Sequence, residues 1–225
     1  MDDRILTFEF VTPCFLGGAS REGPAEWRAG SVRGQLRWWF RAVAGGRYDG
    51  DLQQVRKLEA EIFGTTDRSS SLRVRTLGTP QTFPAGTPCT AGRSLGAEEI
   101  AAMWADSSAG TVSRLRLLSP GGKAFPVNPI HYLAYGPVDR GRFVRSGIPP
   151  EEKARLLLQW RRPPGEEAGK LFDLALRSWL NLGGIGARSR KGFGSLRCLE
   201  VHRGTVRDDE ATDELSPRNA DAFRR

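Results

Sequence analysis

One short segment of the chain, GGIGARSRKGFG at residues 183–194, combines residue types that suit contact with a polyanion. Five of its twelve positions are glycine, which costs backbone entropy on folding and needs a structural reason. Backbone N–H groups in such a loop can face a phosphate. Arg188, Arg190 and Lys191 add positive charge, and Phe193 offers a face for a stacked base. The segment predicts a nucleic-acid contact; the alternative is a glycine-rich turn with solvated basic residues.

A second basic pattern lies in residues 31–44, SVRGQLRWWFRAVA. Arg33, Arg37 and Arg41 recur every fourth residue, so a helix would align them as one ridge. Trp38 would lie away from the apolar stripe of that helix and beside Arg41. The ridge suits a nucleic-acid backbone and equally an acidic partner protein. A third reading is a solvated ridge with Trp38 buried under the insertion that is expected at about residues 79–152.

The spacing of the reactive residues predicts no catalytic, metal or cofactor site. Cys14, Cys89 and Cys198 are too far apart for metal-ligand pairs, and His131 and His202 are also distant from each other. The sequence has no P-loop, HExxH or GxSxG motif. The glycine loop follows a predicted helix, which argues against a dinucleotide site. We therefore expect no catalytic activity of its own and no cofactor, while His131 leaves a general-base role open.

Composition supports a basic, globular protein. The 225 residues include 34 Lys and Arg against 26 Asp and Glu, for a net charge of +8. Hydrophobic residues make up 39% and charged residues 27%, which argues against wholesale disorder. The positive charge points first to nucleic acid and second to an acidic protein or membrane surface. The start, MDDRILTFEF, does not read as a signal peptide, and no apolar run approaches a bilayer span, so we expect a cytoplasmic protein.

Hydrophobic periodicity predicts the elements that must position these residues. Strands are expected at 4–11, 71–78, 111–120 and 195–203, and helices at 31–44, 51–64 and 165–184. Residues 153–161 lie between two pairs of prolines, which favours a strand, although Glu151 and Glu152 could begin a helix there. Ser31 is expected to cap the first helix, and Gly45 with Gly46 to end it. The apolar face of the last helix is predicted to hold Leu171, Leu174, Ala175, Trp179 and Leu182.

The order of the core elements is βαββαβ, which predicts an α+β, ferredoxin-like (RRM-like) fold. A long insertion of about residues 79–152, with a short helix at 96–105, is expected between the second and third core strands. We expect a single domain over residues 1–204, followed by a polar tail at 205–225.

The glycine loop GGIGARSRKGFGS strongly resembles that of the RAMP superfamily of CRISPR-associated proteins. The stretch TPCFLGGA followed by SVRGQLRWWFRA resembles more narrowly the first Cmr subunit of type III-B effector complexes. The resemblance spans most of residues 5–203, with three motifs in the same order. It implies an RRM-like RAMP domain. Relatives of that subunit usually carry two such domains, so it also implies a single-domain variant or a second half on another chain.

The resemblance implies a non-catalytic RNA-binding subunit of a multisubunit ribonucleoprotein that serves antiviral defence. It would contact guide RNA, target RNA or both near the 3′ end of the guide, beside other CRISPR-associated subunits. The alternatives are a RAMP-type endoribonuclease that processes guide precursors, with His131 as its base, and a protein-interaction scaffold. The candidate RNA-contacting residues are Gly17, Gly18, Arg33, Arg37, Trp38, Arg41, Gly183, Gly184, Gly186, Arg188, Ser189, Arg190, Lys191, Gly192, Phe193 and Gly194.

Overall fold

A four-stranded antiparallel sheet forms the centre of the computed structural model. The structure describes residues 2–18, 20, 23–87, 116–118, 124–126, 136–139 and 142–204. The sheet contains β1 (Asp3–Phe10), β2 (Leu72–Leu77), β7 (Lys153–Trp160) and β8 (Leu196–Gly204), in the order β2–β7–β1–β8. This is the strand order of a ferredoxin-like domain. The predicted α+β fold is confirmed.

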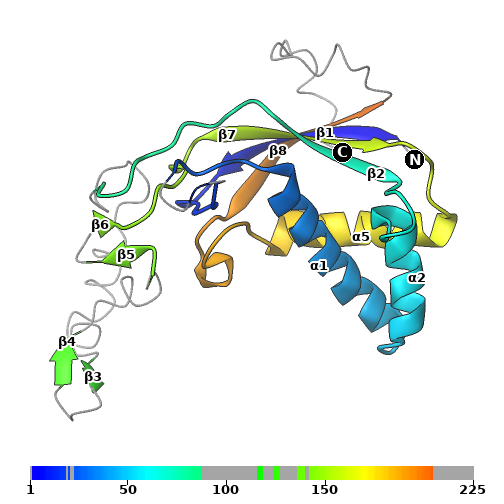
Figure 1. Cartoon of the computed structure of the whole chain (residues 1–225), viewed down its shortest axis with the longest axis horizontal. Coiled ribbons are helices and arrows are strands. Elements are labelled where there is room, and N and C mark those ends of the chain that lie inside the picture. The colour runs from blue at the N-terminus through cyan, green and yellow to red at the C-terminus, as the bar shows by residue number, and fades with distance from the viewer. Residues whose placement is uncertain are drawn as a thin grey trace.

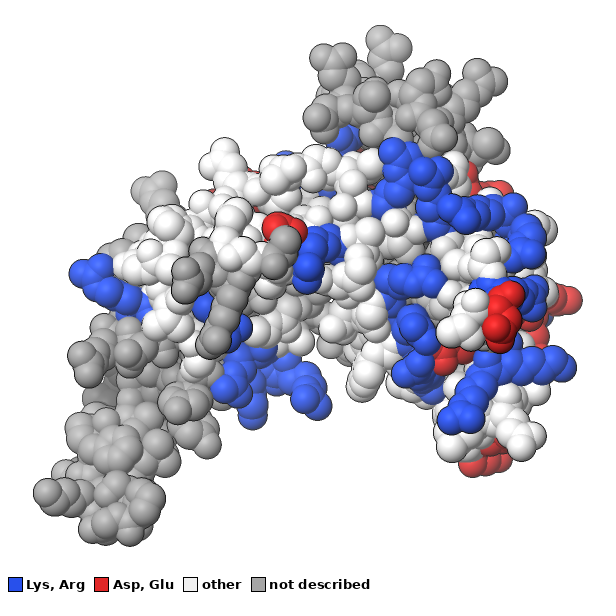
Figure 2. All heavy atoms as spheres, viewed as in Figure 1, with Lys and Arg blue, Asp and Glu red and all other residues white. Residues whose placement is uncertain are grey.

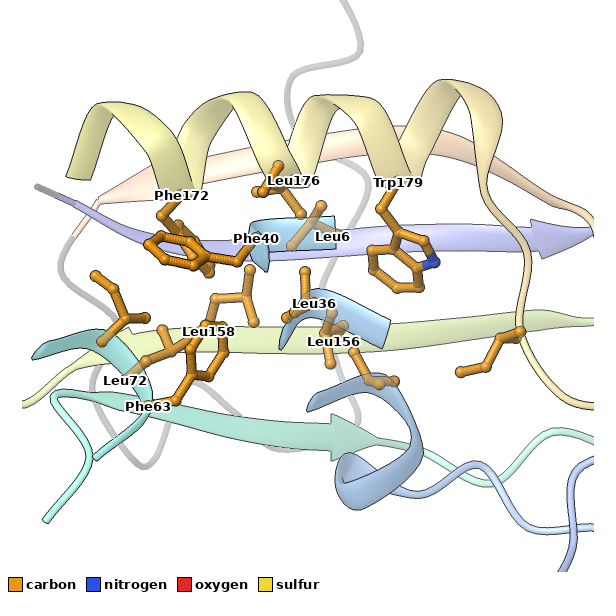
Figure 3. Packing of buried hydrophobic residues seen from close by; sticks show 14 of the residues in the cluster. Leu6, Leu36, Phe40, Phe63, Leu72, Leu156, Leu158, Phe172, Leu176 and Trp179 are labelled. Carbon is orange, nitrogen blue, oxygen red and sulfur yellow. The ribbon is translucent and has the colours of Figure 1, made fainter. Parts of the chain in front are cut away.

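Three helices cover one face of this sheet: α1 (Ala29–Arg47), α2 (Leu52–Phe63) and α5 (Glu166–Leu182) (Figure 1). Alternating residues of β1 point towards them, and Leu6, Phe8 and Phe10 are completely buried. Leu36 and Phe40 of α1 meet this apolar layer, which extends over β7 and α5 (Figure 3). The segment after β1 leads to α1, and the glycine loop leads from α5 to β8, so each of these segments is anchored at one end by the sheet and at the other by a helix.

The insertion between β2 and β7 contributes two short hairpins. One pairs β3 (Arg116–Leu118) with β4 (Ala124–Pro126), and the other pairs β5 (Val138–Asp139) with β6 (Arg142–Phe143). Both lie beyond one end of the main sheet in Figure 1. The helix predicted at 96–105, most of the strand predicted at 111–120, His131 and the tail 205–225 lie outside the described residues.

The predicted ends of the first helix are wrong. The N-cap residue of α1 is Arg28, and the helix runs through Gly45 and Gly46 to Arg47. The buried face of α1, which includes Ala44, keeps the last turn packed against the core, and this packing outweighs the low helix propensity of glycine. Tertiary packing thus places the end of α1 later than local sequence predicts.

The apolar face of α5 holds Leu171, Ala175 and Trp179 as predicted, but it is rotated away from the other two predicted residues. Leu174 and Leu182 are 52% and 77% exposed, whereas Phe172 and Leu176 are buried. The buried residues follow the 3.6-residue period along one side of α5; they are Ala168, Gly169, Leu171, Phe172, Ala175, Leu176 and Trp179. This orientation places the C-terminal end of α5, and the glycine loop that follows, beside the N-terminal segment after β1.

Candidate nucleic-acid interface

The glycine loop connects α5 to β8 and folds back on itself. The Ile185 amide donates to the Gly194 carbonyl at 2.9 Å, and Gly184 pairs with Ser195 in an isolated bridge. Gly194 has a φ of +64°, and a Cβ atom there would lie 1.9 Å from the Ile185 carbonyl oxygen. Only glycine fits so close to another strand of backbone, so at least this glycine serves the closure of the loop.

The inner side of the loop is bonded to the segment that follows β1. The Ala187 amide donates to the Phe15 carbonyl and the Gly194 amide to the Pro13 carbonyl, both at 2.9 Å. A Cβ atom on Gly186 would lie 2.8 Å from the Phe15 carbonyl oxygen. Gly186 and Gly194, which the sequence suggested for phosphate contact, are therefore required by close backbone contacts within the protein. The loop meets the outside mainly through its side chains.

Two side chains of the same segment fix the loop further. The Thr12 hydroxyl donates to the Gly192 carbonyl at 2.7 Å and accepts from the Ser195 amide at 3.0 Å. The buried Cys14 thiol donates to the Ile185 carbonyl at 3.3 Å. Burial raises the pKa of Cys14 to about 12, so the thiol is neutral and unreactive at ordinary pH. Neither role was predicted from the sequence, because nothing in the local pattern connects residue 12 or 14 to a loop 170 or more positions away.

The outer side of the loop presents three cations. Arg188, Arg190 and Lys191 are all exposed, and the last two belong to the 3-10 turn η2 (Ser189–Lys191). Among the residues that the structure describes, no carboxylate forms an ion pair with them. Their charge is therefore available to an external anion. Phe193, by contrast, is half-buried, with its ring centroid 5.7 Å from that of Phe15.

The predicted arginine ridge of α1 faces α2 and makes contacts inside the protein. Glu59 of α2 is buried, and its carboxylate accepts from Arg37 at 2.7 Å and from Arg41 at 2.7 Å and 2.8 Å. Burial alone would raise the pKa of Glu59, but the hydrogen bonds from Arg41 and Arg37 outweigh it and lower the pKa below its ordinary value. The triad joins α1 to α2.

Arg33 is also engaged within the protein. Its guanidinium donates to the Phe63 carbonyl and to the Ser70 hydroxyl, and it lies 5.6 Å from the centroid of the Phe63 ring. Because Arg37 and Arg41 remain about half exposed, the ridge keeps some access to solvent. An RNA contact by these three arginines stays a prediction, but their observed role is to hold the helix layer together.

Trp38 lies on the outer face of α1 and is 57% exposed, so it is not buried under the insertion. It packs edge-on against Trp39, with ring centroids 5.0 Å apart. The Trp39 ring nitrogen in turn lies 3.0 Å from the position that a Cβ atom of Gly183 would take, so the tryptophan pair reaches the start of the glycine loop.

The two predicted glycines after β1 differ in their surroundings. A Cβ atom on Gly18 would lie 2.6 Å from a carboxylate oxygen of Glu26, whereas one on Gly17 would meet no atom within 4 Å.

The described part of the chain contains no group of three or more His, Cys, Asp or Glu side chains that could hold a metal ion, and no helix long and apolar enough to cross a membrane. His202 is exposed on β8, while His131 lies outside the described residues, so the general-base role remains a prediction.

Figure 2 shows Lys and Arg atoms gathered over the turn between α5 and β8. A second basic group covers the end with α1, α2 and β2, where Asp and Glu atoms lie among the cations (Figure 2).

Comparison with known proteins places this arrangement in a family. The model of the RAMP superfamily matches residues 7–197, from β1 through the glycine loop into β8. The chain belongs to the RAMP superfamily. Its ferredoxin-like sheet and its glycine loop are thus the parts that the RAMP model covers, and Thr12, Cys14 and the three loop cations all lie within the match.

Among curated RAMP relatives, the CRISPR system Cmr subunit Cmr1-1 of Pyrococcus furiosus is 28% identical over 198 residues, which are 88% of this chain and 47% of the relative. The subunit Cmr1-2 of the same organism is 40% identical over 75 residues, or 33% of this chain and 40% of the relative. This chain therefore spans less than half the length of the curated relatives that it matches.

Among the solved structures that match this fold are two with a Cmr1 or Cmr name. The crystal structure of Cmr1 from Pyrococcus furiosus in its apo form matches with a TM-score of 0.51 at 24% identity, over 90% of this chain and 50% of that chain. A chain of the cryo-EM structure of the type III-B Cmr-beta bound to cognate target RNA and AMPPnP matches with a TM-score of 0.52 at 14% identity, over 90% of this chain and 56% of that chain. At these identities the likeness concerns the RAMP fold alone.

Proposed function

We propose that this RAMP protein is a non-catalytic RNA-binding subunit of a type III-B CRISPR effector complex. The relatives that match most of the chain or its fold carry the name Cmr1 or belong to a Cmr assembly with target RNA. The partners would be guide RNA, target RNA and other Cmr subunits, with a contact near the 3′ end of the guide. The setting would be cytoplasmic antiviral defence.

The observation that carries this proposal is the form of the glycine loop. Its backbone is bonded to Pro13 and Phe15, while Arg188, Arg190 and Lys191 project from it without a carboxylate partner among the described residues. A loop held in this way presents its charges with little further loss of conformational freedom on binding. Arginine suits phosphate because its planar guanidinium can donate two parallel hydrogen bonds. The proposed mechanism is the positioning of an RNA backbone, not a chemical step.

The test is RNA binding by the whole chain across a series of salt concentrations. Replacing Arg188, Arg190 and Lys191 together by Ala should weaken binding of single-stranded RNA. It should also reduce the slope of log affinity against log salt by about 2, since each contacted phosphate contributes roughly 0.7. Thermal unfolding should stay unchanged, because the three side chains are exposed.

A matched control removes three exposed cations from another part of the surface: Arg56, Lys57 and Arg68. This control lowers the net charge by the same amount but leaves the glycine loop intact. Equal losses in both variants would show a non-specific charge effect and would overturn the proposal. So would the absence of RNA binding by the unaltered chain, both alone and after assembly with its copurifying subunits.

A further inference from the structure

Four phenylalanines from distant parts of the sequence meet beside the glycine loop. Phe15 is at the centre, with ring centroids 5.4 Å from Phe143, 5.7 Å from Phe193 and 6.1 Å from Phe83. Phe83 and Phe143 also pack on each other at 4.7 Å. Phe83 and Phe143 lie where the insertion leaves and re-enters the domain, so the cluster packs the root of the insertion against the loop.

Backbone hydrogen bonds make the root a continuous structure. The Phe143 amide donates to the Thr87 carbonyl at 2.9 Å, and the Gly86 amide donates to the Phe143 carbonyl at 2.7 Å. Cys14 pairs with Ile148 in an antiparallel bridge, which ties the root to the same segment that holds the glycine loop. The loop and the root of the insertion therefore share one support.

One loop cation already reaches the root. The Arg188 guanidinium nitrogen Nη2 lies 3.7 Å from the position that a Cβ atom of Gly136 would take, just before the β5–β6 hairpin. Arg142, the first residue of β6, and Arg145, which follows β6, are both exposed. Arg142 donates to the Gly86 carbonyl at 2.9 Å, which fixes part of its side chain and leaves its other N–H groups for another acceptor.

The charges of this end of the molecule are unbalanced. The packed segments 11–18, 83–87, 142–148 and 184–196 contain no Asp or Glu, and they contain five Lys and Arg residues: Arg142, Arg145, Arg188, Arg190 and Lys191. Two acids border these segments: Glu152, whose carboxylate accepts from the Gln81 amide at 2.8 Å, and Glu26 beside Gly18. Elsewhere, Arg4, Arg37 and Arg41 each have a carboxylate partner. None of the five cations forms an ion pair with a carboxylate among the described residues, so this group is suited to an external polyanion.

We infer that the RNA-contacting surface continues from the glycine loop onto the root of the insertion, where Arg142 and Arg145 are further contacts. This inference rests on the proposed function and extends its site. Four of the five cations are arginines, which favours phosphate groups over the isolated carboxylates of an acidic protein. The ligand is therefore one single-stranded RNA backbone that passes from the loop to the root.

The experiment compares single-stranded RNA binding of the full chain with that of R145A and of R142A/R145A by fluorescence anisotropy over a salt series. The double variant should bind more weakly, with a salt slope reduced by about 1.4, and the single variant should lose about half of that. R145K should keep most of the slope, because it keeps the charge. The control R56A/K57A removes two exposed cations from α2 and should change little.

The outcomes separate this inference from the proposed function. If removal of the three loop cations weakens binding but R142A/R145A retains the affinity and slope of the unaltered chain, the surface ends at the loop and the inference is wrong. If the unaltered chain binds no RNA, the proposed function itself fails. If loss of the Arg142–Gly86 hydrogen bond unfolds the hairpin in the double variant, the single variant R145A provides the test. A loss of binding to poly-glutamate but not to RNA would identify an acidic protein as the partner and overturn the inference.

Discussion

The Thr12 hydroxyl donates a hydrogen bond of 2.7 Å to the carbonyl of Gly192, across 180 positions of sequence. The same oxygen accepts from the Ser195 amide at 3.0 Å. One side chain therefore bonds the backbone at two points, at Gly192 within the glycine loop and at Ser195 directly after it. The loop is consequently a fixed part of the domain and not a free connection between α5 and β8.

Thr12→Val should release the loop, because valine keeps the shape of threonine but offers no hydroxyl. The Ser195 amide would lose its partner, and the Gly192 carbonyl would keep only the hydrogen bond from the Ser195 hydroxyl at 3.1 Å, so we expect the free energy of unfolding to fall by about 1–2 kcal/mol. RNA affinity should fall as well, since the loop cations would be less well positioned. Denaturant unfolding and anisotropy measure the two effects. Thr12→Ser keeps the hydroxyl and should restore most of both; equal behaviour of the two variants would refute a role for this oxygen.

Gly192 and Gly194 form a matched pair for testing the backbone of the loop. Both have positive φ values, +89° and +64°, but a Cβ atom on Gly192 would meet open space, whereas one on Gly194 would lie 1.9 Å from the Ile185 carbonyl oxygen. Gly192→Ala should therefore cost only the left-handed conformation, about 1–2 kcal/mol. Gly194→Ala should cost at least about 3 kcal/mol, because backbone must move. Urea denaturation of both variants checks the ranking, and similar costs would contradict the packing described for Gly194.

Glu59 should make stability depend on acid pH. Its folded-state pKa lies below the ordinary value of 4.5, mainly because the hydrogen bonds from Arg41 and Arg37 outweigh the effect of burial. A lowered folded pKa gives stability that is complete above about pH 4.5 and is lost as the pH falls through the folded value. Glu59→Gln should destabilise the protein by about 1–3 kcal/mol at neutral pH and flatten this part of the pH profile. Thermal unfolding between pH 3 and 7 measures this pH dependence. If the variant loses stability at acid pH as steeply as the unaltered chain, groups other than Glu59 cause the dependence.

Cys14 should resist alkylation for as long as the glycine loop stays closed. Burial raises its pKa to about 12 from an ordinary value of 9.0, so the folded protein holds a neutral, inaccessible thiol. Because the folded pKa is the higher one, stability should fall as the pH rises from about 9 towards about 12, where only the unfolded thiol ionises. Iodoacetamide labelling followed by mass spectrometry should modify the half-buried Cys198 before Cys14.

The Cys14→Ala variant is the control for the alkaline part of this prediction. It should lack the component of the pH dependence that the thiol supplies, whatever the packing cost of the smaller side chain. In the Thr12→Val variant, Cys14 should label faster than in the unaltered chain, because the loop opens more often. Rapid labelling of Cys14 in the unaltered, folded protein would disprove the closed loop.

The sequence alone determined the elements of the fold. Alternation in β1, β2 and β8 and the apolar stripes of α1 and α5 are local patterns of period 2 and 3.6, and they predicted the ferredoxin-like order. The loop motif indicated the RAMP superfamily, which the family match confirms. Helix ends were less accurate: α1 passes through Gly45 and Gly46 because core packing, not local propensity, decides where it stops.

Only the tertiary structure decided which basic residues face outwards. Helical spacing aligned Arg37 and Arg41 correctly but could not reveal that Glu59 of another helix lies against them. In the same way, the glycines of the loop suggested an external anion, whereas the observed contacts of Gly194 are with Pro13 and Ile185. A sequence pattern shows that a residue lies on a given face of its own element. The partner of that face comes from distant segments of the chain, and only packing brings them together.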